Sequence, residues 1–113
     1  MSEIIKVDSY GESYNCSLLV SEYEQNDNMA IMLIEETGEP FADVTVNLEP
    51  LAPGFAYLDT NGLKGVDDIV KKYKIAKPTG ITRKSGWCEY PLYEFDLNEL
   101  RKYAHRDSDY YLI

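Results

Sequence analysis

The sequence predicts an α+β domain, an antiparallel sheet of five or six strands with two helices packed on one face. Two observations predict this class. Alternating apolar and polar residues, separated by short polar turns, fill most of the first sixty positions. Helical signals appear only later, over 66–73 and 97–104. A length of 113 residues predicts a single domain, 1–113, with one modest core.

Five segments before the first helix have the character of strands. The segments 4–10, 14–20 and 42–48 alternate apolar and polar residues, which is typical of half-exposed strands. The segment 29–34 is apolar throughout and suits a strand buried on both faces. Periodicity alone leaves a helix open there, but a hairpin-length turn on each side favours the strand. The segment 55–60 is the last strand of this group, after the breaks at Pro50 and 53–54.

The first helix is predicted where apolar residues recur at i, i+3, i+4 and i+7, namely Val66, Ile69, Val70 and Tyr73. A turn of Asp59, Thr60, Asn61 and Gly62 links the preceding strand to it. Asp59 and Thr60 are predicted to bond nearby backbone amides, and Asn61 and Gly62 to adopt the left-handed conformation. The alternative is a site at which Asp59 serves as an acid, a base or a ligand.

The second half ends with a loop, a strand and a helix. Pro78, Gly80 and Gly86 predict a loop over 75–86. An aromatic strand follows over 87–95, in which Pro91 indicates an edge position or a bulge. Asp96 is predicted to cap a helix over 97–104. The tail, 105–113, either frames a last strand or docks on a partner.

The charge is unevenly distributed. The net charge is −9, and residues 1–60 hold twelve acids and one base, Lys6. Residues 61–113 hold eight acids and ten bases, which gives −11 and +2 for the two parts. An acidic half argues against direct binding to nucleic acid or an anionic membrane, and it suits a protein partner with a basic surface. The alternative is that the acids serve solubility alone.

No motif indicates catalysis, a metal or a cofactor. Cys16 and Cys88 form neither a disulfide framework nor a zinc-ligand pattern. Cys88 and His105 are considered as a nucleophile–base pair, but nothing in the sequence places them together. A signal peptide and an apolar run of membrane-spanning length are not expected. We therefore expect a non-enzymatic cytoplasmic protein with no cofactor and no metal.

Two sets of charged residues are candidate binding sites. The acidic set lines the predicted third and fourth strands and their turn, and consists of Glu35, Glu36, Glu39, Asp43 and Glu49. Carboxylates at alternating strand positions lie ~7 Å apart, close to the spacing of successive phosphates along a nucleic-acid strand. This set is therefore a candidate mimic of DNA, and the alternative is an ordinary solvent-exposed face.

The basic set lies in the predicted loop 77–87 and consists of Lys77, Arg83, Lys84 and Trp87. Its backbone amides and Arg83 are candidates for holding a phosphate, and Trp87 for stacking on a base. The glycine spacing does not match a P-loop. The alternative is a solvated loop whose cations balance the acidic half.

Two stretches resemble a known family. The stretch 55–61 reads Phe-Ala-Tyr-Leu-Asp-Thr-Asn, and 85–95 reads Ser-Gly-Trp-Cys-Glu-Tyr-Pro-Leu-Tyr-Glu-Phe. Together they resemble a family of small bacterial and phage-borne proteins catalogued as a domain of unknown function. That family tends to carry a second Asn where this chain has Gly62. The resemblance implies no activity, but it implies that members are accessory genes of mobile elements.

These observations favour a small acidic protein that acts by binding another protein. Its acidic strands are expected to occupy a basic nucleic-acid-binding groove on that partner, as an accessory or anti-defence protein of a mobile element. The alternative is a nucleotide or nucleic-acid binding module that uses the basic loop 77–87.

Overall fold

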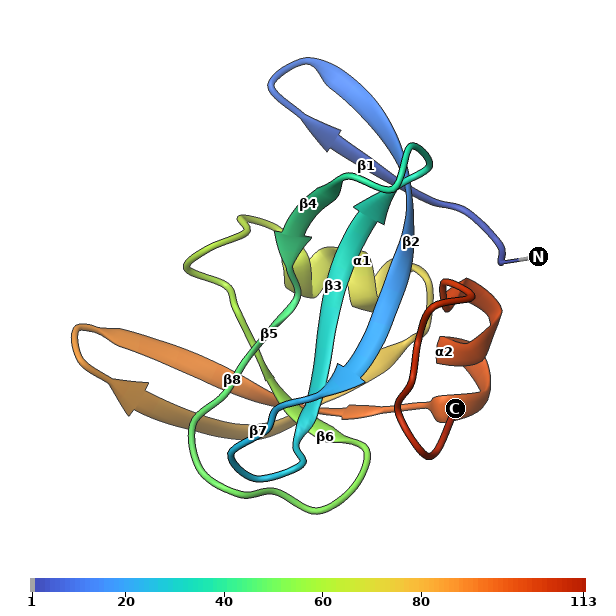
Figure 1. Ribbon diagram of the computed structural model, residues 1–113. Coiled ribbons are helices and arrows are strands. Elements are labelled where there is room, and N and C mark those ends of the chain that lie inside the picture. The colour runs from blue at the N-terminus through green and yellow to red at the C-terminus, as the bar shows by residue number, and fades with distance from the viewer. Residues whose placement is uncertain (1) are drawn as a thin grey trace.

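The computed structural model describes residues 2–113, which form two antiparallel four-stranded sheets and two helices (Figure 1). The first sheet has the order β1-β2-β3-β4, with β1 Ile5–Ser9, β2 Glu12–Glu22, β3 Met29–Glu35 and β4 Pro40–Asp43. The second has the order β5-β6-β8-β7, with β5 Thr45–Val46, β6 Phe55–Leu58, β7 Ala76–Ser85 and β8 Cys88–Phe95. The α+β class is confirmed, whereas a single sheet of five or six strands was wrong.

The predicted strand 42–48 is divided at Val44 into two strands that belong to different sheets. The segment 42–48 was expected to be continuous, but it leaves the first sheet after Asp43 and enters the second at Thr45. The Val44 N–H donates to the Ile31 carbonyl of β3 (2.9 Å), and the Val44 carbonyl accepts from the Asp59 N–H, just after β6 (2.9 Å). Alternation continues through this crossing, so the sequence pattern does not reveal it.

The core lies between the two sheets. Both sheets contribute fully buried side chains, such as Leu33 from β3 and Leu58 from β6, and each helix adds one, Val66 from α1 and Leu100 from α2. Full burial of an aliphatic side chain of this size stabilises the fold by about 1.5–3 kcal/mol. One shared core therefore joins the sheets and the helices.

The outer face of strand β3 is only partly covered, which corrects the prediction that 29–34 is buried on both faces. Met29, Ile31 and Leu33 are buried in the core, whereas Ala30 and Met32 between them are only half-buried. Ile34, near the end of the strand, is buried as well. Ala30 and Met32 are consequently partly accessible to solvent.

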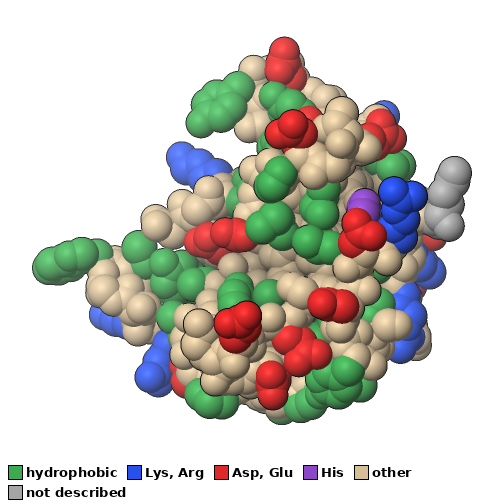
Figure 2. All heavy atoms as spheres, in the orientation of Figure 1, with side chains coloured by type: hydrophobic (Ala, Val, Ile, Leu, Met, Phe, Trp, Pro, Cys, Tyr) green, Lys and Arg blue, Asp and Glu red, His purple; other side chains and the backbone are tan. Residues whose placement is uncertain are grey.

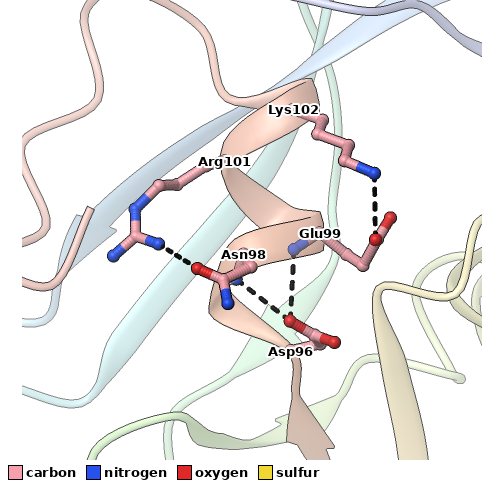
Figure 3. A network of polar contacts seen from close by, with 5 residues as sticks. All are labelled: Asp96, Asn98, Glu99, Arg101 and Lys102. Carbon is pink, nitrogen blue, oxygen red and sulfur yellow. Dashed lines mark hydrogen bonds and ion pairs between the residues drawn. The ribbon is translucent and has the colours of Figure 1, made fainter.

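The two helices lie against different sheets, not together on one face. α1 (Val66–Lys72) contacts β7, and α2 (Leu97–Tyr103) contacts β2. The predicted cap of α2 is present, because the Asp96 carboxylate accepts hydrogen bonds from the backbone N–H groups of Asn98 (3.0 Å) and Glu99 (3.2 Å) (Figure 3). The Glu99 side chain does not return to the cap but accepts from Lys102 at 3.0 Å (Figure 3).

The predicted loop over 75–86 is wrong, since most of it forms strand β7. Pro78 and Gly80 suggested a loop, but they lie at a β-bulge on an edge strand, where a missing N–H or a positive φ is tolerated. Strand β8 pairs with β6 only at 92–94, so Pro91 and the residues before it have β7 as their single neighbour. The residues 80–91 project as a two-stranded hairpin, which we call the β7–β8 arm (Figure 1).

The tail after α2 docks on the chain itself, along the part of β2 that extends past β1. The His105 N–H donates to the Leu18 carbonyl (2.6 Å), and the Asp109 N–H donates to the Val20 carbonyl (2.9 Å). The Val20 N–H in turn donates to the Ser108 hydroxyl (3.0 Å). The tail therefore covers an edge that would otherwise expose unpaired backbone groups.

Candidate functional site

The outer face of the first sheet carries a shallow groove of about 360 Å³. Its floor is apolar and consists of Leu19 from β2 and Ala30 and Met32 from β3. Three acidic side chains, Glu22, Glu24 and Asp43, also line it, together with neutral residues such as Ser21 and Gln25. The Glu22 carboxylate also accepts from the Tyr111 N–H at 3.4 Å. We call the three floor residues and the three acids the acidic groove. No Lys, Arg or His is among the described residues that line it.

Strand register brings these side chains together. Leu19 lies opposite Met32, and Met32 lies opposite Asp43 on its other side. Residues opposite each other on neighbouring strands point to the same face, so the apolar floor and the β4 carboxylate share one surface. Figure 2 shows acidic side chains spread around apolar ones on this side of the molecule, with Lys and Arg at the margins of the view.

A buried polar cluster supports the floor from beneath. Thr45 is almost fully buried, and its hydroxyl oxygen accepts from the Ile31 N–H at 3.0 Å. The Tyr23 hydroxyl is hydrogen bonded to the same oxygen at 3.0 Å. Burial, with a smaller contribution from the charges of Asp43 and Asp59, raises the pKa of Tyr23 above its ordinary value of 10. Tyr23 therefore stays neutral and keeps this contact.

A second anchor fixes the loop at one end of the groove. The Asn28 side chain is buried and donates to the Asn47 side chain (3.0 Å) and the Glu49 carbonyl (2.7 Å). Its side-chain oxygen accepts from the Leu51 N–H at 2.8 Å. The β2–β3 loop is thereby tied to the segment that follows β5, so the loop that carries Glu24 is held in place.

The structure distributes the predicted acidic set over three places. Glu35, Glu36 and Glu39 lie at the turn between β3 and β4, and Asp43 lies on the acidic groove. Glu49 lies after β5, where its carboxylate accepts from the Tyr57 hydroxyl (2.6 Å) and pairs with Arg83 (3.4 Å). Glu22 and Glu24 were missed. The available signal was the strand 29–34, which is apolar on both faces beside an acidic hairpin loop.

The predicted basic set is not gathered into one site either. Arg83 pairs with Glu49, Lys84 lies opposite Glu89 across the hairpin, and Lys77 lies 3.7 Å from Glu94. Trp87 stands at the tip of the β7–β8 arm with its side chain fully exposed.

The stretch expected to hold a phosphate belongs to this hairpin, not to an open loop. Cys88 lies near the tip of the arm, opposite Ser85, whereas His105 lies against β2. No contact between these two side chains is present in the part of the chain that the structure describes.

The turn after β6 is held by its first residue. The Asp59 carboxylate accepts from the Gly62 N–H at 2.8 Å, and the Asp59 carbonyl accepts from the Leu63 N–H at 3.0 Å. A side chain at Gly62 would meet the Asp59 carboxylate, so the Asp59 side chain would have to move to accommodate it. The predicted left-handed conformation of Asn61 and Gly62 was wrong, because the left-handed residue before α1 is Gly65 (φ 81°).

The described residues form neither a metal site nor a membrane-spanning helix. Among residues 2–113, no group of three or more His, Cys, Asp and Glu side chains is arranged to hold a metal ion. Neither of the helices described is long and apolar enough to cross a membrane.

A family model described as "Domain of unknown function (DUF4313)" matches residues 17–113. The chain belongs to the DUF4313 family. The predicted resemblance to a domain of unknown function is thus confirmed, and the match extends well beyond the two stretches that suggested it. The DUF4313 match includes every residue of the acidic groove and excludes β1. Comparisons with curated proteins and with solved structures gave no match.

Proposed function

We propose that this DUF4313 protein is a non-enzymatic binding protein whose acidic groove takes a basic segment of a partner protein. The partner segment that fits best protrudes and combines lysine or arginine side chains with an apolar residue, as at the rim of a nucleic-acid-binding groove. The observation that carries the proposal is the uncovered apolar strip of Leu19, Ala30 and Met32 inside a rim of three carboxylates.

The two parts of the groove would make different contributions. Apolar surface removed from water contributes roughly 25 cal/mol per Å², so the floor would supply affinity that depends little on salt. The rim of Glu22, Glu24 and Asp43 would attract a basic partner and align it, and this effect weakens as salt is added. A partner lacking either the charge or the apolar residue is expected to bind weakly.

The alternative, a nucleotide or nucleic-acid module that uses the β7–β8 arm, has less support. Arg83 is already paired with Glu49, and Lys84 faces Glu89, so the arm offers little uncompensated positive charge. Trp87 remains available for stacking. Stacking without cations to neutralise phosphates is a weak basis for binding nucleic acid.

We further propose an accessory role in a mobile element and a location in the cytoplasm. The first rests on the resemblance of the 55–61 and 85–95 stretches. The second is supported by Cys16 and Cys88, which are both free thiols, as suits a reducing compartment.

The test is a binding assay of the purified chain against a panel of purified host nucleic-acid-binding proteins with pI values above about 9. We expect one or more to bind at low salt and to be displaced by duplex DNA. The variant Glu22→Gln/Glu24→Gln/Asp43→Asn should weaken binding at least about tenfold, because three carboxylates are lost.

The control is Glu36→Gln/Glu39→Gln, which removes carboxylates from the β3–β4 turn, outside the groove. It should leave binding nearly unchanged. Absence of binding across the panel at low salt would overturn the proposal. If the control variant lost as much binding free energy per carboxylate as the groove variant, net charge alone would attract the partner. That result would also overturn the proposal.

A further inference from the structure

A second and larger groove, of about 540 Å³, lies where the end of α1 meets the start of β7 and the end of β8. Three lysines line it, Lys71, Lys74 and Lys77. Its apolar wall consists of Ala76, Pro78 and Phe95, and Glu94 and Asp96 complete the lining. We call this the lysine groove. Its volume lies in the range of sites for small organic ligands.

The two acids of the lysine groove are already engaged. Glu94 lies 3.7 Å from Lys77, and the Asp96 carboxylate accepts the backbone hydrogen bonds that cap α2. Lys71 and Lys74 form no ion pair with any described residue. The groove therefore holds two cations that form no direct ion pair within residues 2–113, although the Asp96 carboxylate lines the same groove.

Lys74 occupies a backbone conformation that a lysine does not favour. Its φ of 57° is left-handed, and it is one of only three non-glycine residues in the described chain with a positive φ. It follows α1, where the Lys74 N–H donates to the Lys71 carbonyl (3.1 Å) and the Ile75 N–H to the Val70 carbonyl (2.9 Å). Helices that end in this way usually carry glycine at this position. This conformation costs stability in a residue that has a side chain, and it places Lys74 in the lining of the groove.

The helix dipole does not account for these lysines. Cations are favourable near the carboxyl end of a helix, which explains Lys71 within the last turn of α1. Lys74 and Lys77 lie beyond that turn, and the favourable effect falls off quickly outside it. Two of the terminal carbonyls are also occupied by the N–H groups of Lys74 and Ile75, which reduces the repulsion that an anion would meet.

We propose that the lysine groove binds a phosphate-bearing nucleotide, either free or at the 5′ end of a strand. The ammonium groups of Lys71 and Lys74 would contact the phosphates as charged hydrogen-bond donors. Pro78, which is exposed, and the small part of the buried Phe95 ring that lines the groove would contact the base. This site is separate from the acidic groove and from the exposed tip of the β7–β8 arm, so it neither requires nor excludes the proposed protein partner.

The experiment measures binding to the full chain by calorimetry at low salt, without divalent metal. The probes are ATP, inorganic pyrophosphate, and one short oligonucleotide with and without a 5′ phosphate. Binding of ATP more tightly than pyrophosphate supports a free nucleotide. Binding of the phosphorylated but not the unphosphorylated strand supports a strand end. Equal binding of both strands, or no binding of any probe at millimolar concentration, overturns the proposal.

Two variants decide whether the site is the lysine groove. Lys74→Gly removes one ammonium and places the favoured residue at a left-handed position, so the variant should fold at least as well as the natural chain. We expect Lys74→Gly to lower the affinity for the probe that binds, by at least about tenfold, as for loss of a charged hydrogen bond. Lys84→Gln removes the same charge from the β7–β8 arm and should change the affinity little. Equal weakening by both variants would indicate unspecific attraction and would overturn the assignment.

Discussion

The two grooves are built in opposite ways. The acidic groove lies on the open face of a sheet, and ladders of hydrogen bonds between β2, β3 and β4 hold its floor. The lysine groove lies where elements end, and its cations are Lys71 in the last turn of α1, Lys74 two residues after α1 and Lys77 at the start of β7. The first surface is fixed by strand register, and the second depends on how one helix terminates.

The difference between the grooves raises the question of whether the acids of residues 1–60 pair with the bases of residues 61–113 in the folded chain. Acids gathered in residues 1–60 and bases gathered after them would cancel if the fold interleaved them. Among residues 2–113, four ion pairs are present, and one of them, Arg83–Glu49, joins the two parts of the chain. The other three lie within the second part. Close ion pairs therefore join the acidic and the basic part of the chain at one point among the described residues.

The largest expected effect concerns alkaline stability on the acidic side. Burial, with the charges of Glu35 and Glu36, raises the pKa of the Cys16 thiol from 9 to about 11. The folded chain then holds the Cys16 proton more tightly than the unfolded chain does. The resulting stability is complete below pH 9 and is lost as the pH rises towards 11. The loss amounts to about 3 kcal/mol at most, since each pKa unit corresponds to about 1.4 kcal/mol.

Urea unfolding of the natural chain, Cys16→Ala and Cys88→Ala at pH 8 and at pH 10.5 measures this loss. Cys16→Ala should be less stable at pH 8 but should lose less stability between the two pH values. Cys88→Ala retains the buried thiol and should behave like the natural chain. A loss in Cys16→Ala as large as that of the natural chain would assign the effect to the tyrosines instead.

The sequence predicted the elements better than their assembly. The segment 66–73 had both a helical period and terminal charges of the right sign, and Asp96 was recognised as a cap because the cap is a local feature. Strand 75–86 was missed because Pro78 and Gly80 are compatible with a bulged edge strand as well as with a loop. The second sheet was missed because the crossing at Val44 leaves alternation intact.

The sites were predictable only in part, for the same reason. Of the predicted acidic set, only Asp43 lies on the acidic groove, because pairing across β2, β3 and β4 selects which carboxylates meet. Of the predicted basic set, only Lys77 lines the lysine groove. Lys71 and Lys74 were interpreted as the end of a helix, and a positive φ at Lys74 is not visible in a sequence. The sequence shows which residues are charged, but it does not show which distant segments the fold brings together.

An effect of intermediate size tests whether the acidic groove is more rigidly held than the lysine groove. It is the loss of stability when a threonine hydroxyl beside each groove is removed. Thr45→Val keeps the shape of the side chain but leaves the buried Ile31 N–H without its acceptor. We expect a loss of about 2 kcal/mol in the free energy of unfolding. Thr79→Val is the counterpart beside the lysine groove, where the Thr79 hydroxyl donates to the Leu92 carbonyl (2.9 Å) and accepts from the Ile81 N–H (3.1 Å).

Thr79 is only half-buried, so water can replace its bonds and the expected loss is about 0.5–1 kcal/mol. Denaturant unfolding of both variants under one set of conditions gives the comparison. Thr45→Val should also weaken binding of the basic partner, since the floor above Thr45 loses support, while Thr79→Val should not. A larger loss for Thr79→Val would reverse the order of rigidity that we infer.

The smallest effect separates charge from structure within the lysine groove. Asp96 both caps α2 and lines the groove, so its removal should act in two directions (Figure 3). Asp96→Ala loses the cap and should cost about 1 kcal/mol of stability. Asp96→Asn keeps a good capping residue and should cost almost nothing. Both variants remove one negative charge beside Lys71 and Lys74, so both should bind the nucleotide about two- to fivefold more tightly.

Calorimetry measures the affinity for the nucleotide, and urea unfolding of the same preparations measures the stability. If affinity followed stability instead, and fell only in Asp96→Ala, then the shape of the α2 end rather than the charge of the groove would govern binding.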